Sequence, residues 1–169
     1  MNAGKGAFVT VGTTEFDQLI MSVTSPDVRK VLRGKGYSSM LLQIGRGNFE
    51  PEVVPASPDS PSVDFYRYKD SVAKDIQNAD LVISHAGAGS VLESLTLGRP
   101  LVVVVNDKLM NNHQIELARR LNKDGYLHYC ICSTLAATLE DVDVSSLRPL
   151  PPGNPTVFAE YLDSVMGFT

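Results

Sequence analysis

His85-Ala-Gly-Ala-Gly-Ser-Val-Leu-Glu-Ser-Leu-Thr-Leu-Gly-Arg-Pro100 is the stretch of this 169-residue chain that decides its fold. It follows the mainly apolar run Asp80-Leu-Val-Ile-Ser84, which is typical of a short buried strand. Beyond its glycines, Val91, Leu92 and Leu95 recur at helical spacing. The stretch therefore predicts a strand, a tight turn at glycines and a helix.

Two glycines in that turn favour an anion-binding site. Gly87 and Gly89 carry no side chain, so a ligand can approach the backbone closely there. The helix that follows begins with unpaired N–H groups and with the positive end of its dipole, and both attract negative charge. We therefore predict that a phosphate-bearing ligand binds at this turn.

Two other interpretations use fewer of these residues. Ser90 could be the N-cap residue of the helix, with Glu93 closing a capping box. Such a cap requires neither His85 nor two glycines, so it explains less of the segment. A dinucleotide-binding fingerprint does not fit, because Leu92 stands at the third glycine position and the segment does not follow the first strand.

Apolar runs alternate with helical patterns along the chain, which is typical of a parallel, doubly wound sheet. The predicted strands are Ala7–Val11, Met40–Ile44, Val63–Tyr66, Leu81–Ile83, Leu101–Val105 and Leu127–Ile131. The predicted helices are Phe16–Val23, Asp27–Arg33, Ser71–Gln77, Ala88–Leu97, Asn112–Asn122 and Thr134–Glu140. If the strand order is 3-2-1-4-5-6, the loops after the first and fourth strands face each other across one crevice.

Composition limits the classes of protein and partner. A chain of 169 residues with 43% hydrophobic content can bury one core, and we expect a single α/β domain over residues 1–148. The net charge is -4 with no basic block, which argues against nucleic acid or an anionic membrane surface as a partner. The apolar runs are far shorter than the roughly 20 residues of a membrane span, and the first residues lack a signal-peptide core. We therefore expect a cytoplasmic protein.

Potential metal ligands are few. Cys130 and Cys132 lie two apart in a predicted strand, without a further cysteine or nearby histidine to complete a metal set, so we expect reduced thiols. Asp141-Val142-Asp143 follows the last predicted helix and is far in sequence from the crevice. A solvated turn explains this acidic pair better than a metal site does. We predict neither a metal nor a cofactor.

Two proline-rich stretches interrupt the alternation. Glu50–Pro61 is expected to form an exposed loop. Residues 149–169 are expected to form a proline-rich spacer and a short amphipathic helix, Val157–Met166. This helix either packs on its own domain or docks on a partner, and the sequence favours neither alternative.

The spacing His-x-Gly-x-Gly-Ser-x-x-Glu-x-x-x-x-Gly-x-Pro resembles the nucleotide-sugar signature in the C-terminal domain of two-domain, Rossmann-like glycosyltransferases of the GT-B class. Further motifs extend the resemblance up to about Cys132. They are similar to the family 28 subunits that bind the donor for adding the second N-acetylglucosamine to dolichol-linked N-acetylglucosamine. These motifs are Phe8-Val-Thr-Val-Gly-Thr-Thr14, Phe16-Asp17, Leu42-Gln-Ile-Gly-Arg-Gly47, Tyr66-Arg-Tyr-Lys-Asp70 and Lys108-Leu-Met-Asn-Asn-His-Gln114.

The resemblance implies one half of a split, inverting N-acetylglucosaminyltransferase whose donor is UDP-N-acetylglucosamine. A membrane-bound partner subunit at the cytosolic face of the endoplasmic reticulum would then bind the dolichol-linked acceptor and supply the general base. We therefore assign no catalytic residue to this chain. Two alternatives stay open: a nucleotide-sugar-binding module without transferase activity, and a complete small enzyme that acts on a nucleotide.

A diphosphate leaving group needs its negative charge neutralised, and helix N–H groups, hydroxyls and a histidine can do this without a metal. Thr13 as the N-cap of the first helix is an equally favoured alternative to phosphate contact. The resemblance implies ribose contact at Glu93, contact with the transferred sugar at Asn112 and Gln114, and uracil contact at Tyr68 and Lys69. For the diphosphate we expect Gly87, Ala88, Gly89 and Ser90 on one side, Gly12, Thr13 and Thr14 opposite, and His85 donating to a phosphate oxygen.

Overall fold

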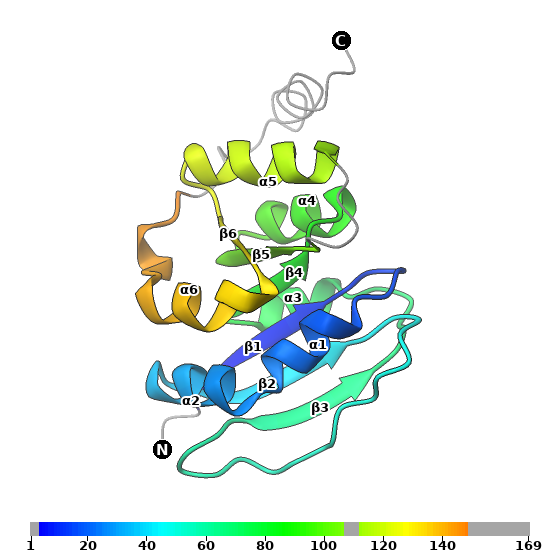
Figure 1. Ribbon diagram of the computed structural model, residues 1–169, viewed down its shortest axis with the longest axis vertical. Coiled ribbons are helices and arrows are strands. Elements are labelled where there is room, and N and C mark those ends of the chain that lie inside the picture. Colours follow the sequence, from blue (N-terminus) through cyan, green and yellow to red (C-terminus); the bar gives the residue numbers. More distant parts are fainter. Residues whose placement is uncertain (1–3, 107–111, 149–169) are drawn as a thin grey trace.

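The structure is a computed structural model that describes residues 4–106 and 112–148 (Figure 1). One sheet runs through the middle of the domain. Its strands are β1 Lys5–Thr10, β2 Tyr37–Gln43, β3 Ser62–Tyr66, β4 Leu81–His85, β5 Leu101–Val105 and β6 His128–Ile131. All neighbouring strands pair in parallel, in the order β3-β2-β1-β4-β5-β6. This confirms the predicted doubly wound sheet and its strand order.

Helices cover both faces of the sheet. They are α1 Asp17–Val23, α2 Pro26–Gly34, α3 Ala73–Asn78, α4 Ala88–Thr96, α5 Asn112–Lys123 and α6 Leu135–Asp141, with the 3-10 turns η1 Cys132–Thr134 and η2 Val144–Ser146. Helices α1, α2 and α6 lie on one face, and α3, α4 and α5 lie on the other (Figure 1). Each helix that was predicted between Phe16 and Glu140 is present, with its ends within two residues of the prediction.

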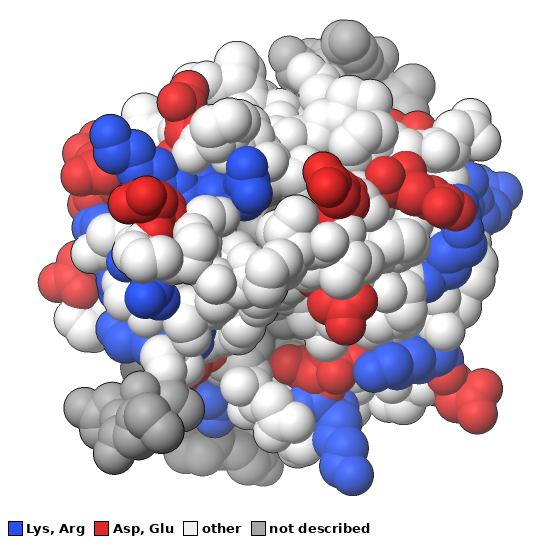
Figure 2. Space-filling view, turned by 90° about the horizontal axis from the view of Figure 1, so that it is seen from below, with Lys and Arg blue, Asp and Glu red and all other residues white. Residues whose placement is uncertain are grey.

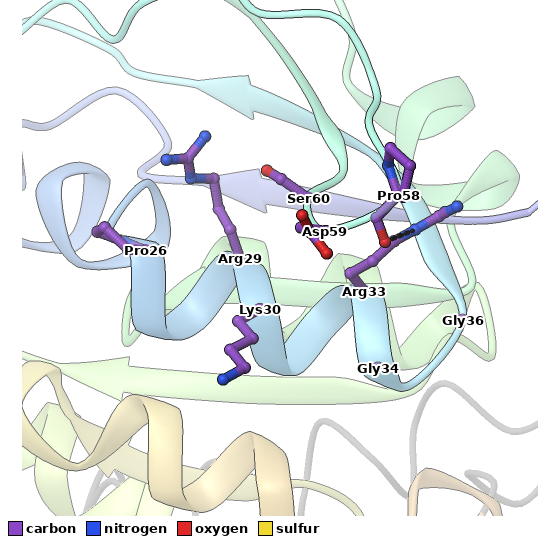
Figure 3. A pocket seen from close by; sticks show the side chains of 9 residues that line it. All are labelled: Pro26, Arg29, Lys30, Arg33, Gly34, Gly36, Pro58, Asp59 and Ser60. Carbon is purple, nitrogen blue, oxygen red and sulfur yellow. Dashed lines mark hydrogen bonds between the residues drawn. The ribbon is translucent and has the colours of Figure 1, made fainter.

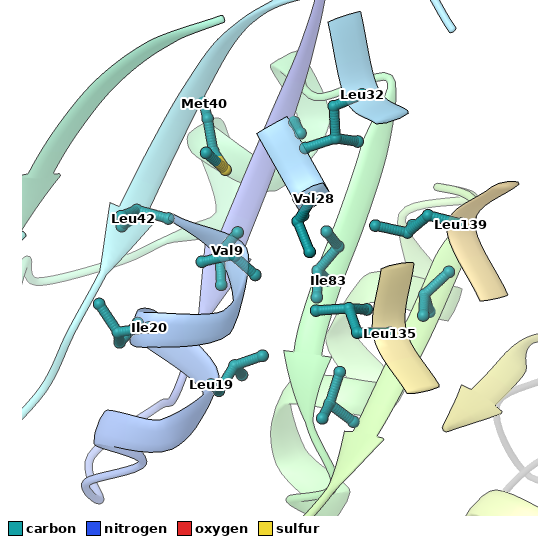
Figure 4. Packing of buried hydrophobic residues seen from close by; sticks show 14 of the residues in the cluster. Val9, Leu19, Ile20, Val28, Leu32, Met40, Leu42, Ile83, Leu135 and Leu139 are labelled. Atoms are coloured by element: carbon teal, nitrogen blue, oxygen red, sulfur yellow. The ribbon is translucent and has the colours of Figure 1, made fainter. Parts of the chain in front are cut away.

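The sheet separates two apolar cores because successive strand residues point to opposite faces. Val9 of β1 packs in the core under α1, α2 and α6, whereas the neighbouring Phe8 packs under α3, α4 and α5. Figure 4 shows the first core, where Leu19, Leu32 and Leu135 converge on the strands. All five residues of β5 are buried, as expected of a parallel strand covered on both sides.

The two cysteines are part of the first core. Cys130 and Cys132 are both buried, and no disulfide joins them. Burial raises the pKa of the Cys130 thiol to about 12, so this thiol stays protonated at neutral pH. The expectation of reduced thiols is met within the core.

Further predictions concern the segments outside the sheet. The predicted exposed loop Glu50–Pro61 lies within residues 44–61, which connect β2 to β3. Its Pro51 and Pro61 are buried, and Val54 bridges to Val63 and packs against the first core. Asp143 accepts hydrogen bonds from the backbone N–H of Ser145 at 3.0 Å and from its hydroxyl at 2.5 Å, so it caps η2.

Residues 149–169, including the predicted spacer and helix, lie outside the described residues. No helix in the described ranges is long and apolar enough to cross a membrane.

Candidate functional site

A cavity of about 490 Å³ opens at the carboxyl ends of the strands, where loops from β1, β3 and β4 meet. This is the edge at which open α/β sheets bind ligands. The residues that line it are Thr10, Gly12, Thr13, Gln43, Tyr68, Lys69, Asp70, Ser71, Val72, His85, Gly87, Gly89, Ser90 and Glu93. Most of the predicted site residues therefore lie together in one cavity, which we call the crevice.

Helix α4 points its N-terminus into the crevice. Its N-cap residue is Gly87, in an extended conformation, and no described side chain caps the helix. Since the first intrahelical bond closes from the N–H of Val91 to the carbonyl of Gly87, the N–H groups that precede Val91 have no acceptor within the helix. Uncapped donors and a positive dipole end together favour an anion.

The capping-box interpretation of this segment is wrong. Ser90 is the third residue of α4 and not its N-cap, because the helix already begins at Ala88. The hydroxyl of Ser90 lies 3.2 Å from Nε2 of His85 instead. Glu93, one turn further along α4, lines the crevice. The loop glycines, which carry no side chain, made the start of the helix ambiguous in the sequence.

His85 fits between two glycines. Gly12 adopts φ +66°, and a Cβ atom built on it would lie 2.8 Å from Nε2 of His85. A Cβ atom on Gly87 would collide with the same imidazole ring. The imidazole thus occupies space that any side chain at either position would need, so both positions require glycine.

Burial makes His85 a neutral group in this crevice. Desolvation lowers the pKa of its imidazole to about 4. At neutral pH one ring nitrogen therefore carries a proton and the other accepts. A neutral imidazole can donate a hydrogen bond to a phosphate oxygen without bringing a permanent positive charge into the site.

Contacts with Asp75 of α3 hold the loop that follows β3. The Tyr66 hydroxyl donates to Oδ2 of Asp75 at 2.6 Å, and Nζ of Lys69 lies 3.0 Å from the same oxygen. The Lys69 ammonium also lies 4.3 Å from the centre of the Tyr66 ring. Burial, and then the hydrogen bond to Asp75, raise the pKa of Tyr66. These contacts leave Tyr68, which is 51% exposed, at the mouth of the crevice.

Some predicted residues stand apart from the crevice lining. Thr14 turns its carbonyl toward the N–H of Arg46, at 3.1 Å, and does not line the crevice. Thr13 does line it, and the alternative that Thr13 caps α1 is wrong because Phe16 is the N-cap residue. Asn112 and Gln114 belong to the first turn of α5, but their side chains lie outside the described part of the structure.

Sequence reasoning missed Gln43, the last residue of β2. Its side chain is buried, lines the crevice and bonds to the backbone of residues 11, 12 and 67. The sequence signals were a polar residue inside the apolar run Met40–Ile44 and the place of that residue in the motif Leu42–Gly47. Thr10, Asp70, Ser71 and Val72 were missed as well, because their place in the crevice depends on where neighbouring loops lie.

A second, larger cavity of about 910 Å³ lies at the opposite end of the strands, between α2 and the turn Ser57–Ser60 (Figure 3). Arg29 and Arg33 flank Asp59 there, and Nε of Arg33 donates to the carbonyl of Pro58 at 3.4 Å. On the face seen in Figure 2, basic and acidic side chains are interspersed and form no continuous patch of one sign.

The chain is similar to known glycosyltransferase sequences. The model of the glycosyltransferase family 28 C-terminal domain matches residues 7–157. A human protein named UDP-N-acetylglucosamine transferase subunit ALG13 is 56% identical over 142 residues, which are 84% of this chain. The protein of the same name from Saccharomyces cerevisiae is 31% identical over 192 aligned positions, covering 94% of each chain.

Solved structures agree with this match. An NMR structure of ALG13 superposes with a TM-score of 0.73 at 28% identity, covering 94% of this chain and 95% of that one. Acinetobacter baumannii MurG superposes with a TM-score of 0.68 at 19% identity, and this likeness shows the fold alone. The chain covers 51% of MurG, 12% of the human relative and 11% of a mouse relative of the same name.

Proposed function

Because the chain belongs to the glycosyltransferase family 28 C-terminal domain family, we propose that it is the donor-binding subunit of a glycosyltransferase and binds UDP-N-acetylglucosamine in the crevice. One observation carries the proposal: the uncapped N-terminus of α4 faces the Gly12 loop across the topological switch point, with His85 between them. The names of the human and yeast relatives support this donor.

The diphosphate would lie at the N-terminus of α4. The backbone N–H groups of Gly89 and Ser90 are free to donate to its oxygens, and the neutral imidazole of His85 adds a further donor. Negative charge grows on the leaving UDP as the sugar–oxygen bond breaks. Donors that are already in place stabilise this charge without reorganisation, so the arrangement needs no metal.

The nucleoside would extend toward the β3 loop. Glu93 lies on the same helix as the phosphate-binding donors, and its carboxylate suits a ribose diol. Tyr68 offers an aromatic face and Lys69 a backbone edge to uracil. Asn112 and Gln114 remain our proposal for the transferred N-acetylglucosamine, since their helix begins at the same edge of the sheet.

The acceptor requires a second polypeptide. The structural match covers 51% of the MurG chain, and the human relative is named a subunit. Both observations support a split, inverting enzyme in which a membrane-bound partner binds the dolichol-linked acceptor and supplies the general base. The complex would add the second N-acetylglucosamine at the cytosolic face of the endoplasmic reticulum. Residues 1–148 of this chain would form the donor domain, and the chain would be recruited to that membrane by its partner.

One assay tests the proposal against its rivals. N-acetylglucosamine transfer from UDP-N-acetylglucosamine to a diphosphate-linked N-acetylglucosamine lipid is measured with the chain alone, with partner-bearing membranes alone, and with both. Activity only in the combined sample is expected. Activity of the chain alone would favour a complete small enzyme, and donor binding without transfer in any sample would favour a non-catalytic binding module.

A further inference from the structure

Gln43 is the last residue of strand β2. It is 2% exposed and lines the crevice. Its Oε1 accepts from the Thr10 hydroxyl at 2.5 Å, from the N–H of Gly12 at 2.9 Å and from the N–H of Val11 at 3.2 Å. Its Nε2 donates to the carbonyl of Gly12 and to the carbonyl of Arg67, both at 2.7 Å. The amide therefore uses both of its N–H groups and its oxygen.

These partners belong to two different loops. Residues 10–12 lead out of β1 to the phosphate-facing side of the crevice, and Arg67 leads out of β3 to the base-facing side. Strand β2 lies between β1 and β3, so Gln43 reaches both loops from the middle. The side chain adds to backbone hydrogen bonds that continue the strand pairing into both loops: the N–H of Val11 donates to the carbonyl of Gln43 at 3.2 Å, and the N–H of Gly45 donates to the carbonyl of Arg67 at 3.3 Å.

Neither glutamate nor an apolar side chain meets both demands. Glutamate has the same shape but, when ionised, would face the carbonyls of Gly12 and Arg67 with an acceptor, and an apolar residue would leave buried groups without partners. A buried polar group without a partner is unfavourable, so the loops would move to find other partners. Arg67 is also held by its own side chain, which donates to the carbonyls of Gly45 and Gly47 at 3.1 and 2.7 Å.

We propose that Gln43 is a positioning residue that holds the phosphate-facing and base-facing loops at a fixed separation, so that the two ends of a nucleoside diphosphate bind at once. This inference rests on the proposed donor site. Gln43 supplies no group to the reacting atoms. It contributes by preorganisation, because loops already set at the correct spacing lose less entropy when the donor binds.

The alternative is a buried amide that only stabilises the sheet. Both hypotheses predict a less stable variant, but they differ in the donor affinity that they predict for the folded variant. Loss of stability alone reduces the amount of folded protein and leaves the affinity of each folded molecule unchanged. Loss of loop spacing weakens the donor affinity of molecules that remain folded.

The test compares Gln43→Leu and Gln43→Glu with Met40→Ala in the full chain. Met40 is a matched control, because it lies on the same strand, is 1% exposed and packs in the first core away from the crevice. UDP and UDP-N-acetylglucosamine binding are measured by calorimetry at a temperature at which each variant is folded. We expect both Gln43 variants to bind about tenfold or more weakly than wild type, and Met40→Ala to bind as wild type does.

A second measurement uses the membrane-reconstituted transfer assay. The Gln43 variants should raise KM for the donor and leave KM for the lipid acceptor unchanged. If Gln43→Leu does not fold, Gln43→Asn serves in its place, since it keeps the amide but is one methylene too short to reach both loops.

The outcomes separate the two proposals. Wild-type protein that fails to bind UDP would overturn the proposed function itself. Wild-type binding that is matched by the folded Gln43 variants would overturn only the positioning role. An equal loss of affinity in Met40→Ala would likewise show that stability, and not loop spacing, sets donor affinity.

Discussion

Gly12→Ala is the substitution that most directly tests the crevice geometry. Gly12 has φ +66°, a conformation that costs an L-residue about 1–2 kcal/mol. The new Cβ atom would also lie 2.8 Å from Nε2 of His85 and 3.4 Å from the Ser90 hydroxyl. The imidazole must therefore move, which breaks its 3.2 Å contact with Ser90 and removes about 1 kcal/mol more. The total loss of about 2–3 kcal/mol leaves a typical domain folded.

Gly98→Ala is the matched control for that experiment. Gly98 has φ +72°, so alanine there carries similar backbone strain, but a Cβ atom would meet nothing within 4 Å. Gly98 also follows the C-terminus of α4, at the edge of the sheet opposite the crevice. Comparing the two variants separates backbone strain from displacement of His85.

Urea unfolding and calorimetric donor binding read out the two effects. Both variants should lose about 1–3 kcal/mol of stability. Only Gly12→Ala should also lose donor affinity, by about ten- to a hundredfold, because a displaced imidazole no longer donates to the diphosphate. Equal donor affinity in the two variants would refute the argument that Gly12, His85 and Ser90 form one phosphate-binding unit.

Three further predictions concern the same crevice. Glu93→Ala and Gln114→Ala should each weaken transfer in the reconstituted complex by about 2–4 kcal/mol of transition-state stabilisation while the protein stays folded, as kcat/KM and circular dichroism would show. Transfer should survive excess EDTA, since helix N–H groups neutralise the leaving group; an activity that magnesium or manganese restores after chelation would contradict this. The pKa of His85, at about 4, lies below the ordinary value of 6.5, so the unfolded chain binds the proton first and stability is lost as pH falls. Between about pH 6.5 and 4 the free energy of unfolding should fall by about 3 kcal/mol more in wild type than in His85→Asn, measured by urea unfolding at each pH.

The sequence by itself determined the layered α/β fold. The five apolar residues of β5 and the helical spacing of Val91 and Leu95 depend only on neighbouring positions in the chain, so local patterning identifies them. The alternation of strands and helices then leaves few permitted topologies, and the strand order followed with it. The family-like spacing from His85 to Pro100 located the glycine turn before α4 for the same reason, since all of its parts lie in one segment.

Only the tertiary structure decided the ends of β2, the contacts of Ser90 and the hydrogen bonds of Gln43. Tyr37 and the two serines that follow it show no apolar run, yet they belong to β2, where Tyr37 pairs with Lys5 and Ser39 with Gly6 of β1. The sequence predicted the start of the helix at Ala88 but left a capping role for Ser90 open, and the structure places the Ser90 hydroxyl 3.2 Å from Nε2 of His85, with Gly87 as the N-cap residue. Gln43 bonds to Gly12 and Arg67, which lie 31 and 24 positions away and come within hydrogen-bonding distance only when the sheet assembles. Contacts between distant segments leave no periodic trace in the chain, so they are decided by packing.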